Sequence, residues 1–250
     1  MYINDVHIMY YVVLGLIGLL VGQFVDWCNT RLPEYKKIFP KNMLKEYKKV
    51  FKPNYVLMIV TAIIYLVLLY ILGIGTTFMS NIRLLKYLIL TPMLLSVVII
   101  DYKMQIIPNR LNLTMFEIGI IFVFLQGMES INVAIDGLLG MLVGGGIFLL
   151  ITLIGGLIAG KEAMGFGDVK LMGALGLFFG WIDMLIISAL AFLIGAILSI
   201  ILLATKKKKT NEYIPFGPFI VLATFIVMCI PSNLLITALL EIFTLGMYQG

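Results

Sequence analysis

Two aspartates lie at the edges of long apolar segments. Asp101 ends one such segment, in the stretch DYKMQIIPNRLNL, and Asp168 begins another, in GFGDVKLMGALGLFFG. Ionisable residues in membrane-like segments are costly and rare, so they are functional candidates by default. If the two side chains converge, they can share one proton, so that one carboxylate acts as a base and the other as an acid. The two aspartates therefore predict an aspartic acid–base site.

The residues before Asp168 favour a functional interpretation of that aspartate. A purely structural role is the alternative, because Asp168 could be the N-cap of the apolar helix that follows. However, Gly165 and Gly167 permit backbone conformations that are closed to other residues and leave no side chain to block a peptide. A protease binds its substrate in an extended form, often through main-chain hydrogen bonds. We therefore expect the loop of Gly165, Phe166 and Gly167, followed by Lys170, to shape a peptide-binding site.

Asp101 is harder to explain as a structural residue. It ends an apolar segment, where the helix dipole disfavours an anion, and a boundary carboxylate that reaches out to water is the alternative. Pro108 and Asn109 follow, and Pro108 predicts a break before the next apolar segment. The single histidine, His7, is expected on the opposite side of the membrane. Neither a serine–histidine pair nor a metal cluster therefore competes with the two aspartates.

The composition excludes a soluble protein. Of the 250 residues, 62% are hydrophobic and 12% are charged, and the mean hydropathy is +1.09. Apolar runs of about twenty residues recur along the chain, which is typical of transmembrane helices. We predict an all-α, polytopic membrane protein with about eight transmembrane helices and its N-terminus outside. The net charge of +5 does not indicate nucleic-acid binding, because the basic residues lie between the apolar runs.

The basic residues gather on one side of this arrangement. Sixteen of the eighteen lysines and arginines fall on the same side, and only Arg83 and Lys86 fall opposite. By the positive-inside rule, the lysine-rich side is cytoplasmic. The segment 170–182 is short and could be re-entrant instead of spanning. The predicted spans are residues 8–25, 55–74, 84–100, 111–127, 136–158, 170–182, 183–203 and 214–230.

The chain is expected to divide into two functional parts. Residues 1–100 form N-terminal spans with a basic cytoplasmic loop at 28–54, and residues 101–250 form a catalytic membrane domain that carries both aspartates. Within the loop, residues 34–54 alternate lysines with aromatic and apolar residues. This pattern predicts an amphipathic helix that lies on anionic headgroups.

Glycines in the fifth predicted span indicate close helix packing. Gly140 and Gly144, and likewise Gly156 and Gly160, are small residues four apart, which lets helices approach closely. A run of three glycines in the same span could instead mark a kink. After the last span, the apolar tail 234–246 is too short to cross a membrane and is expected to form an interfacial helix.

Four stretches of the chain together resemble the landmarks of the type IV prepilin leader peptidases. They are GQFVDWCNTRLP, the Asp101 segment with IIPNRLNL, GFGDVKLMGALGLFFG, and IPFGPF at 214–219, which contains Pro215 and Gly217. The resemblance implies an intramembrane aspartic endopeptidase of the bacterial cytoplasmic membrane, with Asp101 and Asp168 as the catalytic pair. It also implies type IV prepilins or pseudopilins as substrates, cut after the glycine of a short basic leader. The remaining landmark residues become candidates for substrate binding or loop geometry.

The resemblance also bears on cofactors and partners. Many members methylate the new N-terminus with S-adenosylmethionine and hold zinc through two CxxC pairs in the first cytoplasmic loop. Here Cys28 and Cys229 are the only cysteines, so zinc is not expected, and S-adenosylmethionine is needed only if methylation is retained. The expected partners are prepilins and the lipid bilayer, with no nucleic acid. Asp26, interpreted as a solvated charge near Arg31, and Glu162 are candidates for binding the basic leader.

Three alternatives remain open at this point. A bifunctional peptidase and N-methyltransferase would need the same two aspartates and a methyl donor. An ion-coupled transporter could use paired intramembrane acids as a relay, although the two halves of the chain show no convincing repeat of the kind transporters have. A structural scaffold of a secretion machine would leave the GFGD stretch and the placement of Asp101 unexplained.

Overall fold

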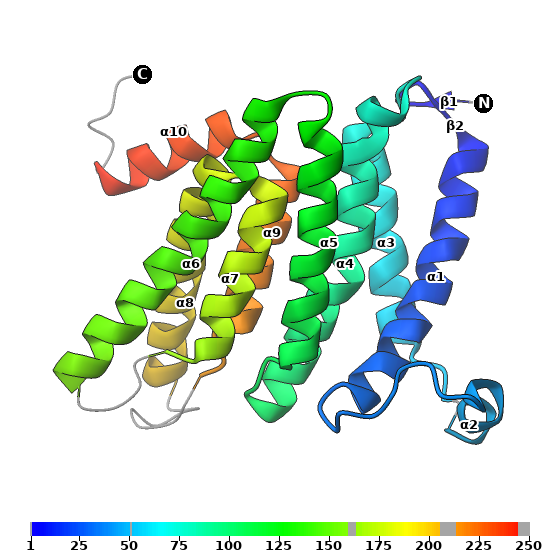
Figure 1. Ribbon diagram of the computed structural model, residues 1–250, viewed down its shortest axis with the longest axis horizontal. Coiled ribbons are helices and arrows are strands. Elements are labelled where there is room, and N and C mark those ends of the chain that lie inside the picture. Colours follow the sequence, from blue (N-terminus) through cyan, green and yellow to red (C-terminus); the bar gives the residue numbers. More distant parts are fainter. Residues whose placement is uncertain (1, 51, 160–163, 206–213, 245–250) are drawn as a thin grey trace. The chain divides into compact units, whose positions relative to one another are not determined.

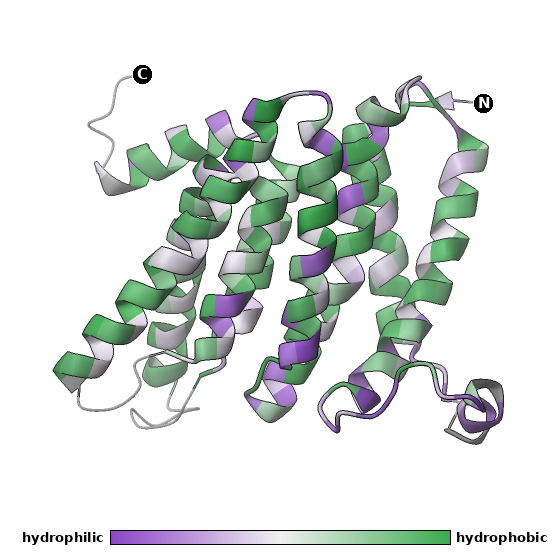
Figure 2. Cartoon of the chain, viewed as in Figure 1, coloured by the Kyte–Doolittle hydropathy of each residue, from purple (hydrophilic) through white to green (hydrophobic). Residues whose placement is uncertain are grey.

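The computed structural model describes residues 2–50, 52–159, 164–205 and 214–244, and this part of the chain is helical almost throughout (Figure 1). Six of its helices are long and apolar enough to cross a membrane, and Figure 2 shows hydrophobic residues along most of their length. The predicted all-α, polytopic membrane fold is thus confirmed. The six helices are α1 (Ile8–Arg31), α3 (Tyr55–Leu72), α4 (Phe78–Met104), α5 (Asn109–Gly127), α6 (Ile131–Ala159) and α8 (Trp181–Ala204).

Shorter helices occupy the other predicted segments. α7 (Phe166–Phe179) and α9 (Gly217–Cys229) have 14 and 13 residues. At 1.5 Å per residue each is about 20 Å long, which is less than the ~30 Å hydrocarbon core of a bilayer. The number of eight spans therefore stays a prediction, as does the side of the N-terminus. The apolar tail forms α10 (Ser232–Phe243), and the predicted amphipathic helix is limited to α2 (Met43–Val50).

Two compact units make up the chain, Met1–Lys103 and Met104–Gly250. Asp101 belongs to the first unit and Asp168 to the second, and each unit is described by itself below. The division into an N-terminal part and a catalytic part stays a functional prediction.

In the first unit, α1 and α3 touch backbone to backbone. A Cβ atom on Gly18 would lie 2.6 Å from the Cα atom of Ala62, and one on Gly22 would lie 2.6 Å from the Cα atom of Met58. No side chain fits at either position, so these two glycines, four residues apart, set the close approach of the helices. The sequence analysis did not identify this pair, although its spacing is the same as that of the pair in the fifth predicted span.

A proline inside α4 is compensated by a side chain from α3. Pro92 has no N–H to donate to the carbonyl of Leu88 four residues earlier, which leaves that oxygen without its helical partner. The hydroxyl of Tyr65 donates to the Leu88 oxygen at 2.8 Å. The contact ties α3 to the helix that carries Asp101.

The residues before α1 form a short hairpin that was not predicted. β1 (Tyr2–Ile3) pairs antiparallel with β2 (Val6–His7). Asn4 and Asp5 connect them with φ angles of 49° and 61°, which suits a tight turn of the type that Asn and Asp favour. His7 then accepts a hydrogen bond from the backbone N–H of Met9 at 3.3 Å, and so caps α1.

In the second unit, glycines set the contact between α6 and α7. A Cβ atom on Gly140 would lie 2.4 Å from the carbonyl oxygen of Gly176, and one on Gly144 would lie 2.7 Å from that of Met172. The predicted packing role of Gly140 and Gly144 is confirmed. For the second predicted pair, Gly160 lies outside the described residues. α6 runs through the three consecutive glycines without interruption, and a kink at these glycines stays a prediction.

Candidate active site

Asp168 is the third residue of α7. The N-cap of this helix is Gly165, and the backbone N–H of Asp168 donates to the Gly165 carbonyl at 3.0 Å. The interpretation of Asp168 as the N-cap is therefore wrong. Its side chain is 3% exposed, and the positive end of the helix dipole stabilises a carboxylate in the first turn. Asp168 is thus a buried carboxyl group at the N-terminal end of a helix dipole.

The two glycines before Asp168 act differently from the sequence-based expectation. Gly165 has φ −64°, which other residues adopt freely, and Gly167 is not among the described residues with positive φ. Glycine is favoured at position 167 because there is little room for a side chain: a Cβ atom there would lie 3.2 Å from the Cβ atom of Ile107. The GFGD turn therefore packs tightly against the linker that leads from α4 to α5.

Lys170 joins two of the predicted landmarks. Its Nζ atom donates to Oδ1 of Asn109 at 2.8 Å and lies 5.3 Å from the centroid of the Phe166 ring. A cation over an aromatic face is attracted by the ring's quadrupole. The structure thus brings together four predicted site residues, Asn109, Phe166, Gly167 and Lys170, at the starts of α5 and α7.

Asn112 is a site residue that the sequence analysis missed. It is 4% exposed, and its Nδ2 atom donates to the carbonyl of Gly167 at 3.1 Å. Its Oδ1 atom is buried and has no hydrogen-bond partner within the described part of the chain. A signal was available, because Asn112 is a polar residue one helical turn after Asn109 in an otherwise apolar segment.

A cavity of about 430 Å³ opens beside these residues, between α5, α6 and α7. Its polar lining consists of Asn109, Asn112 and Lys170, and the rest of the wall is apolar or glycine. The cavity therefore combines a polar part next to the GFGD turn with an apolar interior. The apolar and glycine lining residues are Leu113, Phe116, Met141, Gly173 and Ala174.

Asp101 lies three residues before the end of α4 and is 3% exposed. This burial argues against a boundary carboxylate that reaches for water. Gln105 follows the helix in the left-handed region with φ 54°, and Pro108 is the N-cap of α5. The break that Pro108 predicted is confirmed.

Phe216, between Pro215 and Gly217, lies in an aromatic cluster. It is the N-cap of α9. Its ring centroid lies 5.9 Å from that of Phe148 on α6 and 5.2 Å from that of Phe192 on α8. The landmark IPFGPF therefore packs the start of α9 against α6 and α8, and it does not line the cavity.

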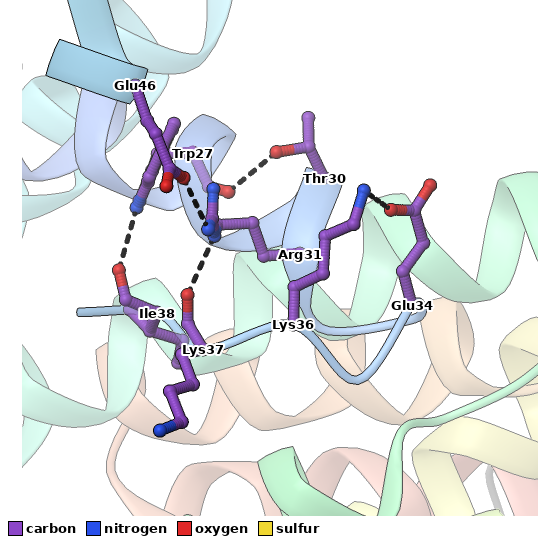
Figure 3. Close-up of polar contacts among 8 residues, drawn as sticks. All are labelled: Trp27, Thr30, Arg31, Glu34, Lys36, Lys37, Ile38 and Glu46. Atoms are coloured by element: carbon purple, nitrogen blue, oxygen red, sulfur yellow. Dashed lines mark hydrogen bonds and ion pairs between the residues drawn. The ribbon is translucent and has the colours of Figure 1, made fainter. Parts of the chain in front are cut away.

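Asp26 and Arg31 have different partners from those expected. Asp26 accepts a hydrogen bond from Nδ2 of Asn54 at 2.7 Å. Arg31 instead pairs with Glu46 of α2 at 2.9 Å and stacks over Trp27 at 4.3 Å from the ring centroid (Figure 3). Asp26 is half-buried, and its interpretation as a solvated charge near Arg31 stays a prediction.

Several predicted charged positions lie outside the described residues. They are Glu162, the other candidate for binding a basic leader, and the basic residues Lys161 and 206–209. In the described ranges, no three His, Cys, Asp or Glu side chains form a group that could hold a metal ion. Cys28 and Cys229 lie in different units. These residues do not fit the zinc site that many members of the resembled family carry.

Comparisons with known proteins cover two of the four predicted landmarks, the stretches that contain Asp101 and Asp168. Residues 88–200 match the model of the type IV leader peptidase family. Among curated proteins, the prepilin leader peptidase/N-methyltransferase of Aeromonas hydrophila is 33% identical over 144 residues, which is 58% of this chain and 49% of the relative. The protein of the same name from Pseudomonas aeruginosa is 34% identical over 142 residues, 56% of this chain and 48% of the relative.

A third relative of the same name, from Legionella pneumophila, is 34% identical over 148 residues, 59% of this chain and 50% of the relative. No solved structure has a significant match to the chain. The chain spans about half the length of the curated relatives it matches. The segment matched by the family model contains both Asp101 and Asp168. Residues 88–200 of the chain are therefore similar to the type IV leader peptidase family.

Proposed function

We propose that the protein is a membrane aspartic endopeptidase that removes the short leader from type IV prepilins or pseudopilins. The observation that carries the proposal is the burial of Asp168 in the first turn of α7, directly after a turn that Asn112 and Ile107 hold in place. The family match over residues 88–200 and the names of the relatives support prepilin processing.

The proposed mechanism is general acid–base attack of water on the scissile carbonyl. Asp168, whose ionised form the helix dipole favours, takes a proton from water, and the resulting oxygen nucleophile attacks the carbonyl carbon. Asp101, at the opposite end of a helix dipole, donates its proton to the carbonyl oxygen. As the tetrahedral intermediate collapses, Asp168 gives the proton it took from water to the leaving nitrogen, Asp101 takes back a proton from a hydroxyl of the intermediate, and no covalent enzyme intermediate forms.

The reaction is proposed to take place at the cytoplasmic face of the bacterial cytoplasmic membrane. The lysine-rich loop 28–54 supports this side by the positive-inside rule. The leader would remain in the cytoplasm, while the apolar helix of the prepilin approaches through the lipid bilayer.

Two carboxylates suffice for cleavage, so we propose no cofactor for the peptidase reaction. Methyl transfer is a second activity, favoured by the printed names of the relatives, and it would need S-adenosylmethionine. Mass spectrometry of the mature pilin N-terminus separates the two cases, since a methyl group adds a fixed mass to the cleaved product.

The test is co-expression with a prepilin, followed by a gel-shift assay for leader removal. Asp101→Asn and Asp168→Asn should each abolish cleavage, because each variant lacks one half of the acid–base pair. Asp5→Asn, the same change in the exposed hairpin turn, is the matched control and should cleave normally. Substantial cleavage by either site variant, in protein that inserts into the membrane, would overturn the aspartic mechanism.

A further inference from the structure

The cavity between α5, α6 and α7 has the features of a side-chain pocket next to the proposed reaction site. We infer that it binds the first bulky apolar side chain on the membrane side of the scissile bond, while Oδ1 of Asn112 accepts a main-chain N–H of the same substrate segment. The inference rests on the proposed function and names a specificity pocket for it.

The walls of the cavity select for an apolar group. Its volume of about 430 Å³ lies within the range of ~300–1,000 Å³ that is usual for ligand pockets, and it exceeds the needs of a single leucine or phenylalanine side chain. Leu113, Phe116 and Met141 supply apolar surface. The ammonium group of Lys170 is held by Asn109 and the Phe166 ring, which keeps this charge with the polar residues at the helix starts.

The amide of Asn112 supplies a hydrogen-bond acceptor in a fixed direction. Its Nδ2 atom must face the carbonyl of Gly167 at 3.1 Å, because a flipped amide would set two oxygens against each other. Oδ1 then points elsewhere, buried and without a partner within the described part of the chain. A buried acceptor of this kind requires a donor, and the main chain of an apolar peptide segment offers one in every N–H.

The position of Asn112 links the cavity to the proposed chemistry. Its hydrogen bond goes to Gly167, the residue immediately before Asp168. A substrate held by Oδ1 of Asn112, with its side chain in the cavity, would therefore have the neighbouring peptide bond next to the GFGD turn. A phospholipid chain could fill the apolar walls, but its hydrocarbon has no donor for the Asn112 oxygen, so a peptide fits both features.

The first experiment measures specificity in purified, full-length protein. Two prepilins that differ only in the first residue after the scissile bond, phenylalanine or alanine, are cleaved, and the ratio of their kcat/KM values is compared. We expect the wild-type protein to favour phenylalanine at least tenfold. Leu113→Phe, which narrows the cavity, should reduce this ratio at least fivefold by slowing the phenylalanine substrate. Gly146→Ala is the control, because a Cβ atom there meets nothing within 4 Å and Gly146 does not line the cavity.

The second experiment needs no cleavage. A prepilin with a diazirine analogue of leucine at the same position is photo-crosslinked to the Asp168→Asn variant, and the adducts are mapped by mass spectrometry. Adducts on Leu113, Phe116 or Met141 would support the inference, whereas adducts confined to other helices or to lipid would overturn it. A third outcome is that the wild-type protein cleaves prepilin without a preference for phenylalanine and without adducts on the cavity residues. In that case the inference fails and the proposed function stands. If it neither cleaves nor crosslinks, both fail.

Discussion

Nζ of Lys170 lies 2.8 Å from Oδ1 of Asn109, and this contact joins the starts of α7 and α5 across 61 residues of sequence. The linker before Asn109 begins where α4, the helix of Asp101, ends, and Lys170 stands two residues after Asp168. The hydrogen bond therefore ties the start of α5 to the helix that carries Asp168. Both side chains are exposed, so its contribution to stability is modest, and its main effect is to fix the geometry of the turn.

A double-mutant cycle tests this contact. Lys170→Met and Asn109→Ala should each lower kcat/KM for prepilin cleavage several-fold, and the double variant should be little worse than either single variant. The expected coupling is about 0.5–1.5 kcal/mol, as for one intramolecular hydrogen bond. Lys103→Met, which removes a lysine from the exposed end of α4, serves as the control. Fully additive effects would mean that the two residues act separately.

Gly167 should tolerate alanine poorly. The added Cβ atom would lie 3.2 Å from the Cβ atom of Ile107, so the turn or the linker has to move by a few tenths of an ångström, and Asp168 follows directly. Because small misplacements of catalytic groups cost large factors in rate, we expect at least a tenfold loss of cleavage. The thermal midpoint in detergent should change by only a few degrees. Gly146→Ala, in an open position on α6, should cleave like the wild type.

The protein is predicted to work without zinc. A four-ligand zinc site cannot be built from two cysteines in different units and a histidine that caps α1. Purified protein should therefore contain no stoichiometric zinc, and chelators should leave cleavage unchanged. The contacts of Arg31 with Glu46 and Trp27 hold α2 against the end of α1, which gives the basic loop 28–54 an order that needs no metal. One tightly bound zinc per chain, measured by metal analysis, would contradict the prediction.

Membrane topology provides a separate prediction. Reporters fused within 34–54 and 205–212 should both indicate the cytoplasm, and a reporter within 128–135 should indicate the outside. If the 205–212 reporter indicates the outside while the other two behave as expected, α7 does not cross the membrane. The eight-span arrangement would then be wrong, whereas the sidedness of the first loop would be unaffected.

The sequence predicted features that depend on single residue types with strong physical preferences. The lengths of the apolar runs predicted the long helices, and Pro108 predicted the break after α4. The spacing of Gly140 and Gly144 predicted close packing of the helix that carries them, α6, which contacts α7. Each of these follows from local chemistry. Asn109 and Lys170 were candidate site residues because they belong to the two motif stretches that carry the aspartates, and the structure joins them by a hydrogen bond.

Features that depend on tertiary neighbours were missed or misread. Gly167 is small because Ile107 approaches it, and nothing within GFGD reveals that neighbour. Asn112 belongs to the site because its Nδ2 atom donates to the Gly167 carbonyl. Asp26 accepts a hydrogen bond from Asn54, a partner 28 residues away that the sequence did not reveal. Pro215 and Gly217 stay site candidates by their motif, and the sequence did not reveal that Phe216 between them packs against Phe192.

The last prediction concerns the proline in α4. Pro92 leaves the Leu88 carbonyl without a helical donor, and the Tyr65 hydroxyl supplies one at 2.8 Å. Tyr65→Phe should therefore destabilise the protein by about 1 kcal/mol, the contribution of one part-buried hydrogen bond. In a Pro92→Ala background the alanine N–H can donate to the Leu88 carbonyl. Tyr65→Phe should then lower the free energy of unfolding by less than half as much as it does with Pro92 present. Unfolding in detergent micelles, followed by circular dichroism for the four proteins of the cycle, measures both costs.

The control for this cycle is Tyr70→Phe, on an exposed turn of the same helix α3. It removes a hydroxyl of the same type and should change the free energy of unfolding by less than about 0.5 kcal/mol. Equal costs for Tyr65→Phe with and without Pro92 would show that the hydroxyl does not replace the missing N–H. The coupling matters for function because α4 carries Asp101 nine residues after the proline. A loosened α3–α4 contact should therefore lower cleavage as well as stability, and Pro92→Ala should restore both together.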